Sequence, residues 1–184
     1  GDGDFNDAAI AVRRAGLPTP SPGALRAPGN RGGNVTLNAA LSGLPANFGE
    51  LGAFYVDGPD GSLGSLKPGA AGYAAAALAA ANRSLLYAAG AGGSRQLAVP
   101  AGRYVAFYAI AGGSTADLLA RNPANAASGA TRAYFSFTDA NPDDLASFRW
   151  ASPEGQAANA ELGQLHLGPP DAGHAATISL SFGA

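Results

Sequence analysis

The sequence predicts an all-β protein: an antiparallel β-sandwich with two short helical insertions. Segments rich in aromatic and β-branched residues recur along the chain, and several alternate apolar with polar positions. Glycine (27 residues) and proline (13 residues) are abundant, which suits short strands joined by tight turns. No run of about 18 apolar residues occurs, so no membrane-spanning helix is expected.

Three regions are expected along the chain. Residues 1–12 form an acidic turn that leads into a short apolar strand, in which Ala8, Ile10 and Val12 share one face. Residues 13–33 contain four prolines and five glycines, a density that predicts a linker without strand or helix. Residues 34–184 then form the sandwich domain.

The strands of the sandwich follow from alternation and from aromatic content. Segment 174–182 alternates most clearly, with Ile178 and Leu180 opposite serine and threonine positions. Segments 102–110 and 131–138 are rich in aromatic residues, which fit a half-buried pleated surface. The full set of expected strands is 34–42, 51–56, 102–110, 131–138, 147–151, 161–167 and 174–182.

Two helices are expected between these strands. Segment 72–82 is rich in alanine, the best helix former, and follows a Pro-Gly turn. Segment 114–120 opens with Ser114 and Asp117 at the spacing of a capping box. Asn141 followed by proline and two acids resembles a helix N-cap.

Composition and motifs argue against catalysis and against nucleic acid as a partner. The formal net charge is −2, which offers no electrostatic attraction for a polyanion. Cysteine is absent, which excludes disulfides and thiol chemistry. No nucleophile elbow, zinc-binding helix motif or phosphate-binding loop occurs, so the chain is not expected to be an enzyme. The sequence opens at Gly1 without methionine, which fits removal of a signal peptide and secretion.

Acidic turns suggest a Ca²⁺ site. Oxygen-bearing side chains at alternate positions around a glycine can surround this ion, which prefers flexible oxygen cages. The same residues also fit a solvated acidic turn, and the turn at 57–61 is most simply a hairpin turn. The candidate ligands are Asp2, Asp4, Asn6 and Asp7, joined by Asp57 or Asp60 from a facing turn.

Several short motifs, in order over residues 48–182, resemble the DUF4114 domain. That family occurs in large secreted bacterial surface proteins, many of them adhesins. The resemblance therefore implies a secreted, non-enzymatic β module linked to Ca²⁺. The matching residues are Glu50-Leu51-Gly52, Phe54, Val56-Asp57, Asp60-Gly61, Pro68-Gly69, Gly72-Tyr73, Leu78, Thr115 to Leu119, Ala120-Arg121-Asn122-Pro123, Phe135-Ser136-Phe137 and Ala140-Asn141-Pro142-Asp143.

The chain departs from the family in the order of its last elements. The family's acidic loop and final strand follow its other motifs, whereas here the intact acidic loop and strand stand at residues 2–12. Three explanations remain open: the tail of a preceding tandem module, a permuted domain, or a strand donated to a neighbouring subunit. The third is favoured, because segment 174–182 already supplies a terminal strand and the linker gives residues 1–12 reach.

The expected function is that of a secreted structural subunit of an extracellular bacterial fibre or matrix. Subunits would join head-to-tail into a homopolymer by N-terminal strand exchange, a contact that does not close on itself. The alternative is a Ca²⁺-dependent adhesin module at the cell surface that binds a glycan or protein. The side chains expected in the joining strand are Phe5, Ala8, Ile10 and Val12.

Overall fold

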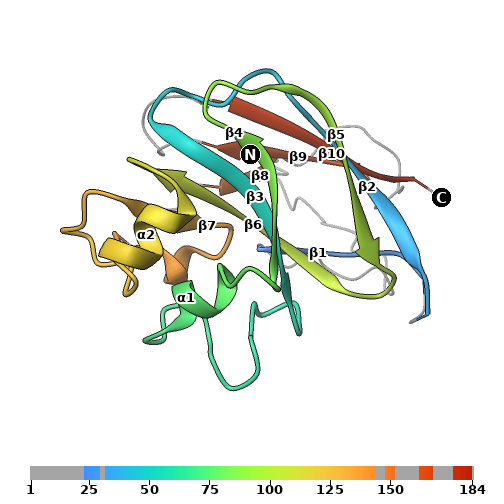
Figure 1. Ribbon diagram of the computed structural model, residues 1–184. Helices are drawn as coiled ribbons and strands as arrows, with labels where there is room; N and C mark the ends of the chain where they lie inside the picture. Colours follow the sequence, from blue (N-terminus) through green and yellow to red (C-terminus); the bar gives the residue numbers. More distant parts are fainter. Residues whose placement is uncertain (1–22, 30–31, 144–147, 152–161, 168–175, 184) are drawn as a thin grey trace, which may run out of the picture.

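A computed structural model describes residues 23–29, 32–143, 148–151, 162–167 and 176–183. Within these ranges the chain forms strands, two short α-helices and one 3₁₀ turn (Figure 1). The elements are β1 (Ala24–Arg26), β2 (Asn34–Leu41), β3 (Phe48–Val56), α1 (Tyr73–Ala77), β4 (Arg83–Ala88), β5 (Gly93–Pro100), β6 (Tyr104–Ala111), α2 (Thr115–Arg121), β7 (Arg132–Phe135), η1 (Thr138–Ala140), β8 (Phe148–Ala151), β9 (Leu162–Leu167) and β10 (Ala176–Gly183).

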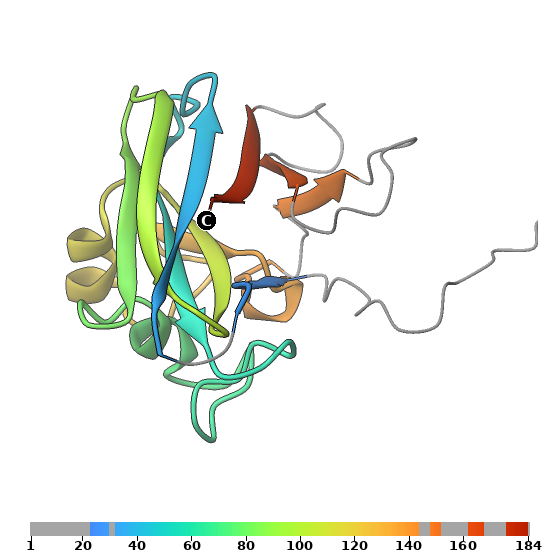
Figure 2. The same cartoon turned by 90° about the vertical axis from the view of Figure 1, so that its right-hand side faces the viewer.

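The described strands form two sheets in which every pair is antiparallel. The first sheet has the order β1-β6-β3-β4, with β7 also paired to β6. The second sheet has the order β5-β2-β10-β9-β8. Figure 2 shows the helices on one side of the molecule and strands β8–β10 on the other. The predicted antiparallel β-sandwich with two short helices is confirmed.

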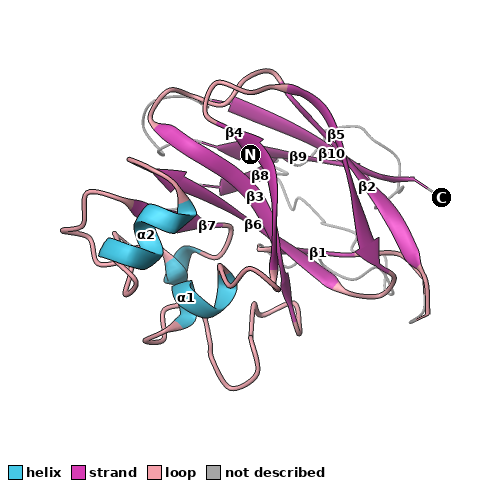
Figure 3. Ribbon diagram, in the orientation of Figure 1, coloured by secondary structure: helices cyan, strands magenta, loops and turns pink. Residues whose placement is uncertain are grey.

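Two apolar clusters hold these layers together. The inner cluster lies between the sheets and includes Leu37, Leu51, Phe107 and Ile178. The outer cluster covers the opposite face of the first sheet, where α1, α2 and η1 pack (Figure 3). Because the first sheet is covered on both faces, β6 is buried almost throughout, and its sequence is apolar without alternation. Burial of a side chain such as Phe107 contributes about 2 kcal/mol.

The Ala-rich helix is shorter than expected, and the strand that follows it was not predicted. α1 ends at Ala77, and the chain turns back so that β4 can pair with β3. Asn82 fixes this return by donating a hydrogen bond from Nδ2 to the Tyr55 carbonyl at 3.1 Å. Helix propensity is thus overridden by strand pairing.

Three other local predictions differ from the structure. The expected linker 13–33 contains β1, in which Ala24 is 5% exposed. The turn at 57–61 is not a hairpin turn, because α1 separates β3 from its partner β4. Asn141 caps η1 at its C-terminal end and binds the backbone of β7, described below, instead of opening a helix at residues 142–143.

The predicted cap of α2 is confirmed. Ser114 Oγ accepts a hydrogen bond from the Asp117 N–H at 3.2 Å, and Asp117 Oδ2 accepts one from the Ser114 N–H at 3.0 Å. This reciprocal pair satisfies two of the free donors at the start of the helix.

Candidate functional site

One edge of the buried strand β6 is completed by two separate segments that lie end to end. β7 pairs with residues 108–111 of β6, and β1 pairs with residues 104–106. β1 comes from the N-terminal part of the chain, far in sequence from β7. We call the position that β1 occupies the β6 slot, which is formed by residues 102–107, 136 and 137. A strand as buried as β6 cannot leave this edge open without cost, because its amides and carbonyls are shielded from water.

Ser136 joins the two segments at the middle of β6. Its N–H donates to the Phe107 carbonyl at 2.9 Å, as in an ordinary ladder. Its hydroxyl then takes the place of a strand carbonyl: Oγ accepts from the Phe107 N–H at 3.0 Å and donates to the Gly23 carbonyl at 2.5 Å. Ser136 is 5% exposed, so these bonds form away from water. The hydroxyl thereby satisfies both strands where the backbone ladder is interrupted.

The slot accepts only glycine at its first position. A Cβ on Gly23 would lie 2.2 Å from the Phe137 ring. The same ring meets Gly61, where a Cβ would lie 2.7 Å away and where φ is +77°. Phe137 therefore packs between two glycines, one from the N-terminal segment and one from the 57–61 turn. Tyr73 Oη donates to the Gly61 carbonyl at 2.7 Å and fixes this turn against the ring.

The remaining contacts of β1 also require small residues. Ala24 packs in the outer cluster and Ala27 in the inner one, and Ala27 is 0% exposed. The Ala27 N–H donates to the Arg103 carbonyl at 2.8 Å, and the Gly102 N–H donates to the Ala27 carbonyl at 3.1 Å. A short segment with the pattern glycine, alanine, leucine, arginine, alanine thus fills the slot.

Two asparagines seal the outer edge of β7. Asn125 binds both backbone groups of Ala133: its Oδ1 accepts from the N–H at 2.8 Å and its Nδ2 donates to the carbonyl at 2.8 Å. Asn141 Oδ1 accepts from the Phe135 N–H at 2.6 Å. Both asparagines are 5% exposed. Side-chain amides therefore occupy the positions that an added strand would need.

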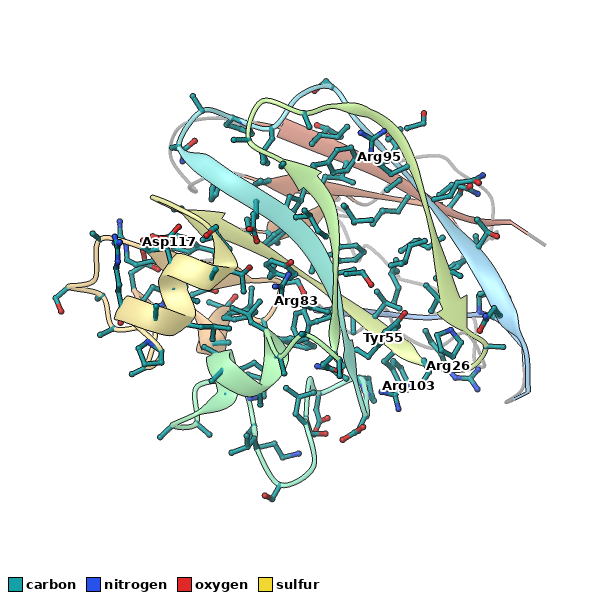
Figure 4. The ribbon with its side chains drawn as sticks, in the orientation of Figure 1. Arg26, Tyr55, Arg83, Arg95, Arg103 and Asp117 are labelled. Carbon is teal, nitrogen blue, oxygen red and sulfur yellow. The ribbon has the colours of Figure 1, made fainter. Side chains whose placement is uncertain are left out.

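The edge of β5 is covered in part. Tyr55 Oη donates to the Ala98 carbonyl at 3.3 Å, and Pro100 ends the strand without an N–H. The Arg103 guanidinium lies 5.7 Å from the centre of the Tyr55 ring, and Figure 4 labels both side chains. Burial raises the pKa of Tyr55, and the charge of Arg103 opposes that shift. The tyrosine hydroxyl thus stays protonated and able to donate to β5.

A polar cluster joins the strands of the first sheet to α2. Thr115 Oγ1 donates to Glu50 Oε2 at 2.5 Å, and Arg83 Nε donates to the Leu78 carbonyl at 2.9 Å. A Cβ on Gly52 would lie 2.5 Å from two atoms of the Tyr108 ring, so this ring packs directly against the Gly52 backbone. Burial raises the pKa of Tyr108, with Arg83 opposing the shift. The Glu50 carboxylate thus holds the Thr115 hydroxyl, and the cluster fastens β3, β4 and β6 to the helices.

Asp57 and Asp60, predicted as Ca²⁺ ligands, bind groups of the protein itself. Asp57 Oδ2 accepts from the Gly64 N–H at 2.7 Å, and Asp57 Oδ1 lies 3.9 Å from Arg103 Nη1. Asp60 pairs with Lys67 and accepts from the Ser62 hydroxyl at 2.7 Å. The bond from Lys67, and then that from Ser62, holds the pKa of Asp60 well below its usual range. These two carboxylates are therefore already engaged by donors of their own loop.

No three metal-binding side chains meet within the described ranges. The other predicted ligands, Asp2, Asp4, Asn6 and Asp7, lie outside the described residues, as do the predicted joining residues Phe5, Ala8, Ile10 and Val12. The structure instead shows that Ser136 and Phe137 hold Gly23, at the start of β1, against the first sheet. Sequence reasoning missed them, although the unusual glycine before an Ala-Leu-Arg-Ala run was a signal.

No family model, curated protein or solved structure matches the chain. The likeness to the DUF4114 domain therefore stays a prediction. Neither α1 nor α2, the helices of the part of the chain that is described, has the length and apolar character needed to cross a bilayer.

Proposed function

We propose that the chain is a structural subunit of an extracellular bacterial fibre or matrix and that its N-terminal segment joins one subunit to the next. The observation that carries this proposal is the β6 slot. The first sheet is completed by β1, which lies just after the predicted joining residues 1–12 and is held by main-chain bonds and small side chains. Addition of an extended segment to a sheet edge is a recurrent mode of subunit joining.

The occupied edges support a place for residues 1–12 on a neighbour. β10 lies between β2 and β9, so the terminal strand of the second sheet already has its position. β1 and β7 together fill the edge of β6, and Asn125 and Asn141 seal β7. In the described sheets the end strands left for a strand formed by residues 1–12 are β4, β5 and β8, and a neighbouring subunit offers the same edges. Such a head-to-tail contact does not close on itself and leads to filaments.

Deletion of residues 1–15 is expected to abolish self-association. The deletion keeps residues 16–27 and therefore keeps β1 in the β6 slot, so the domain should stay folded. Sedimentation velocity should show assemblies of the full chain that grow with concentration, and monomers of the truncated chain. A second variant, the full chain with Ile10→Asp and Val12→Asp, keeps its length but loses the apolar face of residues 1–12. It should also sediment as a monomer. Monomers of the full chain at every concentration would favour the adhesin module that binds a glycan or protein.

Calcium is proposed as a second fastening at Asp2, Asp4, Asn6 and Asp7. An ion bound only by the folded or assembled state stabilises that state, by about 2.7 kcal/mol at a hundred times the dissociation constant. Added Ca²⁺ should therefore raise the melting temperature of the assembled chain, and Asp4→Asn should remove the increase. Asp60→Asn is the control, because Asp60 pairs with Lys67 and should leave the response unchanged. A melting temperature insensitive to Ca²⁺ in the unmodified chain contradicts the metal proposal.

A further inference from the structure

We infer that the β6 slot accepts β1 from a second copy of this chain, so that residues 23–27 are exchanged between subunits. This inference rests on the proposed self-association and names the place where one subunit enters the next. It differs from a contact made only by residues 1–12, because it uses a slot whose geometry is described in full.

All the polar contacts that define the slot come from one continuous body of the chain. The bonds to β1 are made by Gly102, Arg103, the ladder of β6 and Ser136, and the steric limit is set by Phe137. Each of these groups lies more than 70 residues after β1 in the sequence. A β1 segment from a second copy would meet identical partners, so the exchange would keep every one of these bonds.

The connection between β1 and β2 is built for such an exchange. It consists of the six residues 28–33, with the sequence Pro-Gly-Asn-Arg-Gly-Gly. In the closed arrangement Gly29 has φ of +86° and Gly32 has φ of +131°, conformations that favour glycine. The two ends of the connection both bond to the 101–102 turn, Ala27 through the Gly102 N–H and Gly33 through the Ala101 N–H. An extended form of six residues would instead span about 20 Å. Opening would release the requirement for positive φ and carry β1 away from its own sheet.

The slot also selects the segment that enters it. Glycine must stand against Phe137, and buried alanine must follow at positions 24 and 27. Residues 8–12, Ala-Ala-Ile-Ala-Val, have no glycine, so they do not meet this requirement. The exchanged segment is therefore β1, and residues upstream of it would extend over the surface of the receiving subunit.

Engineered cysteines can decide which copy supplies β1. Ala24 faces Ala106 across the β1–β6 ladder, at a position between hydrogen-bonded pairs, where Cα atoms lie about 4.5 Å apart. That separation permits a disulfide, and the chain contains no other cysteine. Assembled Ala24→Cys/Ala106→Cys protein should, after mild oxidation, give a ladder of disulfide-linked oligomers on a non-reducing gel. The pair Arg26→Cys/Tyr104→Cys, at the more exposed end of β1, repeats the test if the first variant folds poorly.

The control pair is Ala40→Cys/Ser94→Cys, which joins β2 to β5 inside one domain and should give only intrachain disulfides. If the assembled Ala24/Ala106 or Arg26/Tyr104 protein also gives only intrachain disulfides, exchange of β1 is overturned while assembly by residues 1–12 stands. If the chain sediments as a monomer at every concentration, both the exchange and the proposed function are overturned.

Discussion

Valine in place of Gly23 is expected to expel β1 from the β6 slot. A Cβ at this position would lie 2.2 Å from the Phe137 ring, and the branched side chain would add two further methyl groups. Phe137 cannot move away easily, because Gly61 packs against the opposite edge of its ring. Overpacking of this kind costs about 1–3 kcal/mol, and we expect the upper end because the Ser136 bond to Gly23 is lost with it.

Urea unfolding and amide hydrogen exchange measure this effect. The amides of Ala27 and Gly102 bond across the slot, so both should lose protection in Gly23→Val. Gly33→Val is the matched control: a Cβ there meets nothing within 4 Å, so valine should leave stability and protection nearly unchanged. Equal behaviour of the two variants would contradict the packing described for the slot.

Asn125→Gly is expected to open the outer edge of β7. Asn125 has φ of +52°, which glycine adopts without strain, so the substitution removes the side-chain amide and keeps the backbone. The Ala133 N–H and carbonyl lose their partners in a buried environment, and each such loss costs about 1–3 kcal/mol. We therefore expect the free energy of unfolding to fall by about 3 kcal/mol.

An unsealed edge should also attract other strands. Chemical denaturation gives the loss of stability, and light scattering at rising concentration gives the association that follows exposure of β7. Gln96→Ala serves as the control, because the Gln96 amide binds Asn38 on the exposed surface and its removal should cost at most about 0.5 kcal/mol. An Asn125→Gly variant as stable as Gln96→Ala would contradict the role given to Asn125.

The elements with a strong periodic signal were predictable from sequence. β10 alternates, and its Ile178 and Leu180 face the inner cluster as expected. β6 was predicted from its aromatic content instead of a period, as a half-buried strand, and the structure buries it on both faces. The capping box at Ser114 also follows from local chemistry alone. In each case neighbouring residues carry the information.

Other strands gave no readable period. β4 contains a bulge opposite Leu51 and Gly52, so Leu86 and Tyr87 both enter the inner cluster and the alternation is broken. β5 is an edge strand whose first residues are exposed and polar. β1 is three residues long and lies in a segment where proline and glycine argue against any strand. These strands form because they pair with other strands, β4 with β3, β5 with β2 and β1 with β6, and such pairing leaves no local pattern in the sequence.

The candidate site was predictable only in its general place. The sequence pointed to residues 1–12 as the joining strand, whereas the slot at residues 102–107 and 136–137 holds residues 23–27, which were expected to lie in a linker. Asn141 resembled a helix N-cap because proline follows it, whereas its side chain binds the Phe135 N–H. Contacts of this kind depend on how the chain folds in space, so no local sequence motif predicts them.

The most direct measurement of the central claim is electron microscopy of the full chain beside the chain that lacks residues 1–15, both in Ca²⁺. The account predicts filaments from the full chain and dispersed particles from the truncated one. The truncated chain keeps β1 and the β6 slot, where exchange by itself adds no bond, but it lacks residues 1–12, which hold the neighbouring subunit. Dispersed particles from both chains, or filaments from both, would contradict the claim that the N-terminal residues join the subunits.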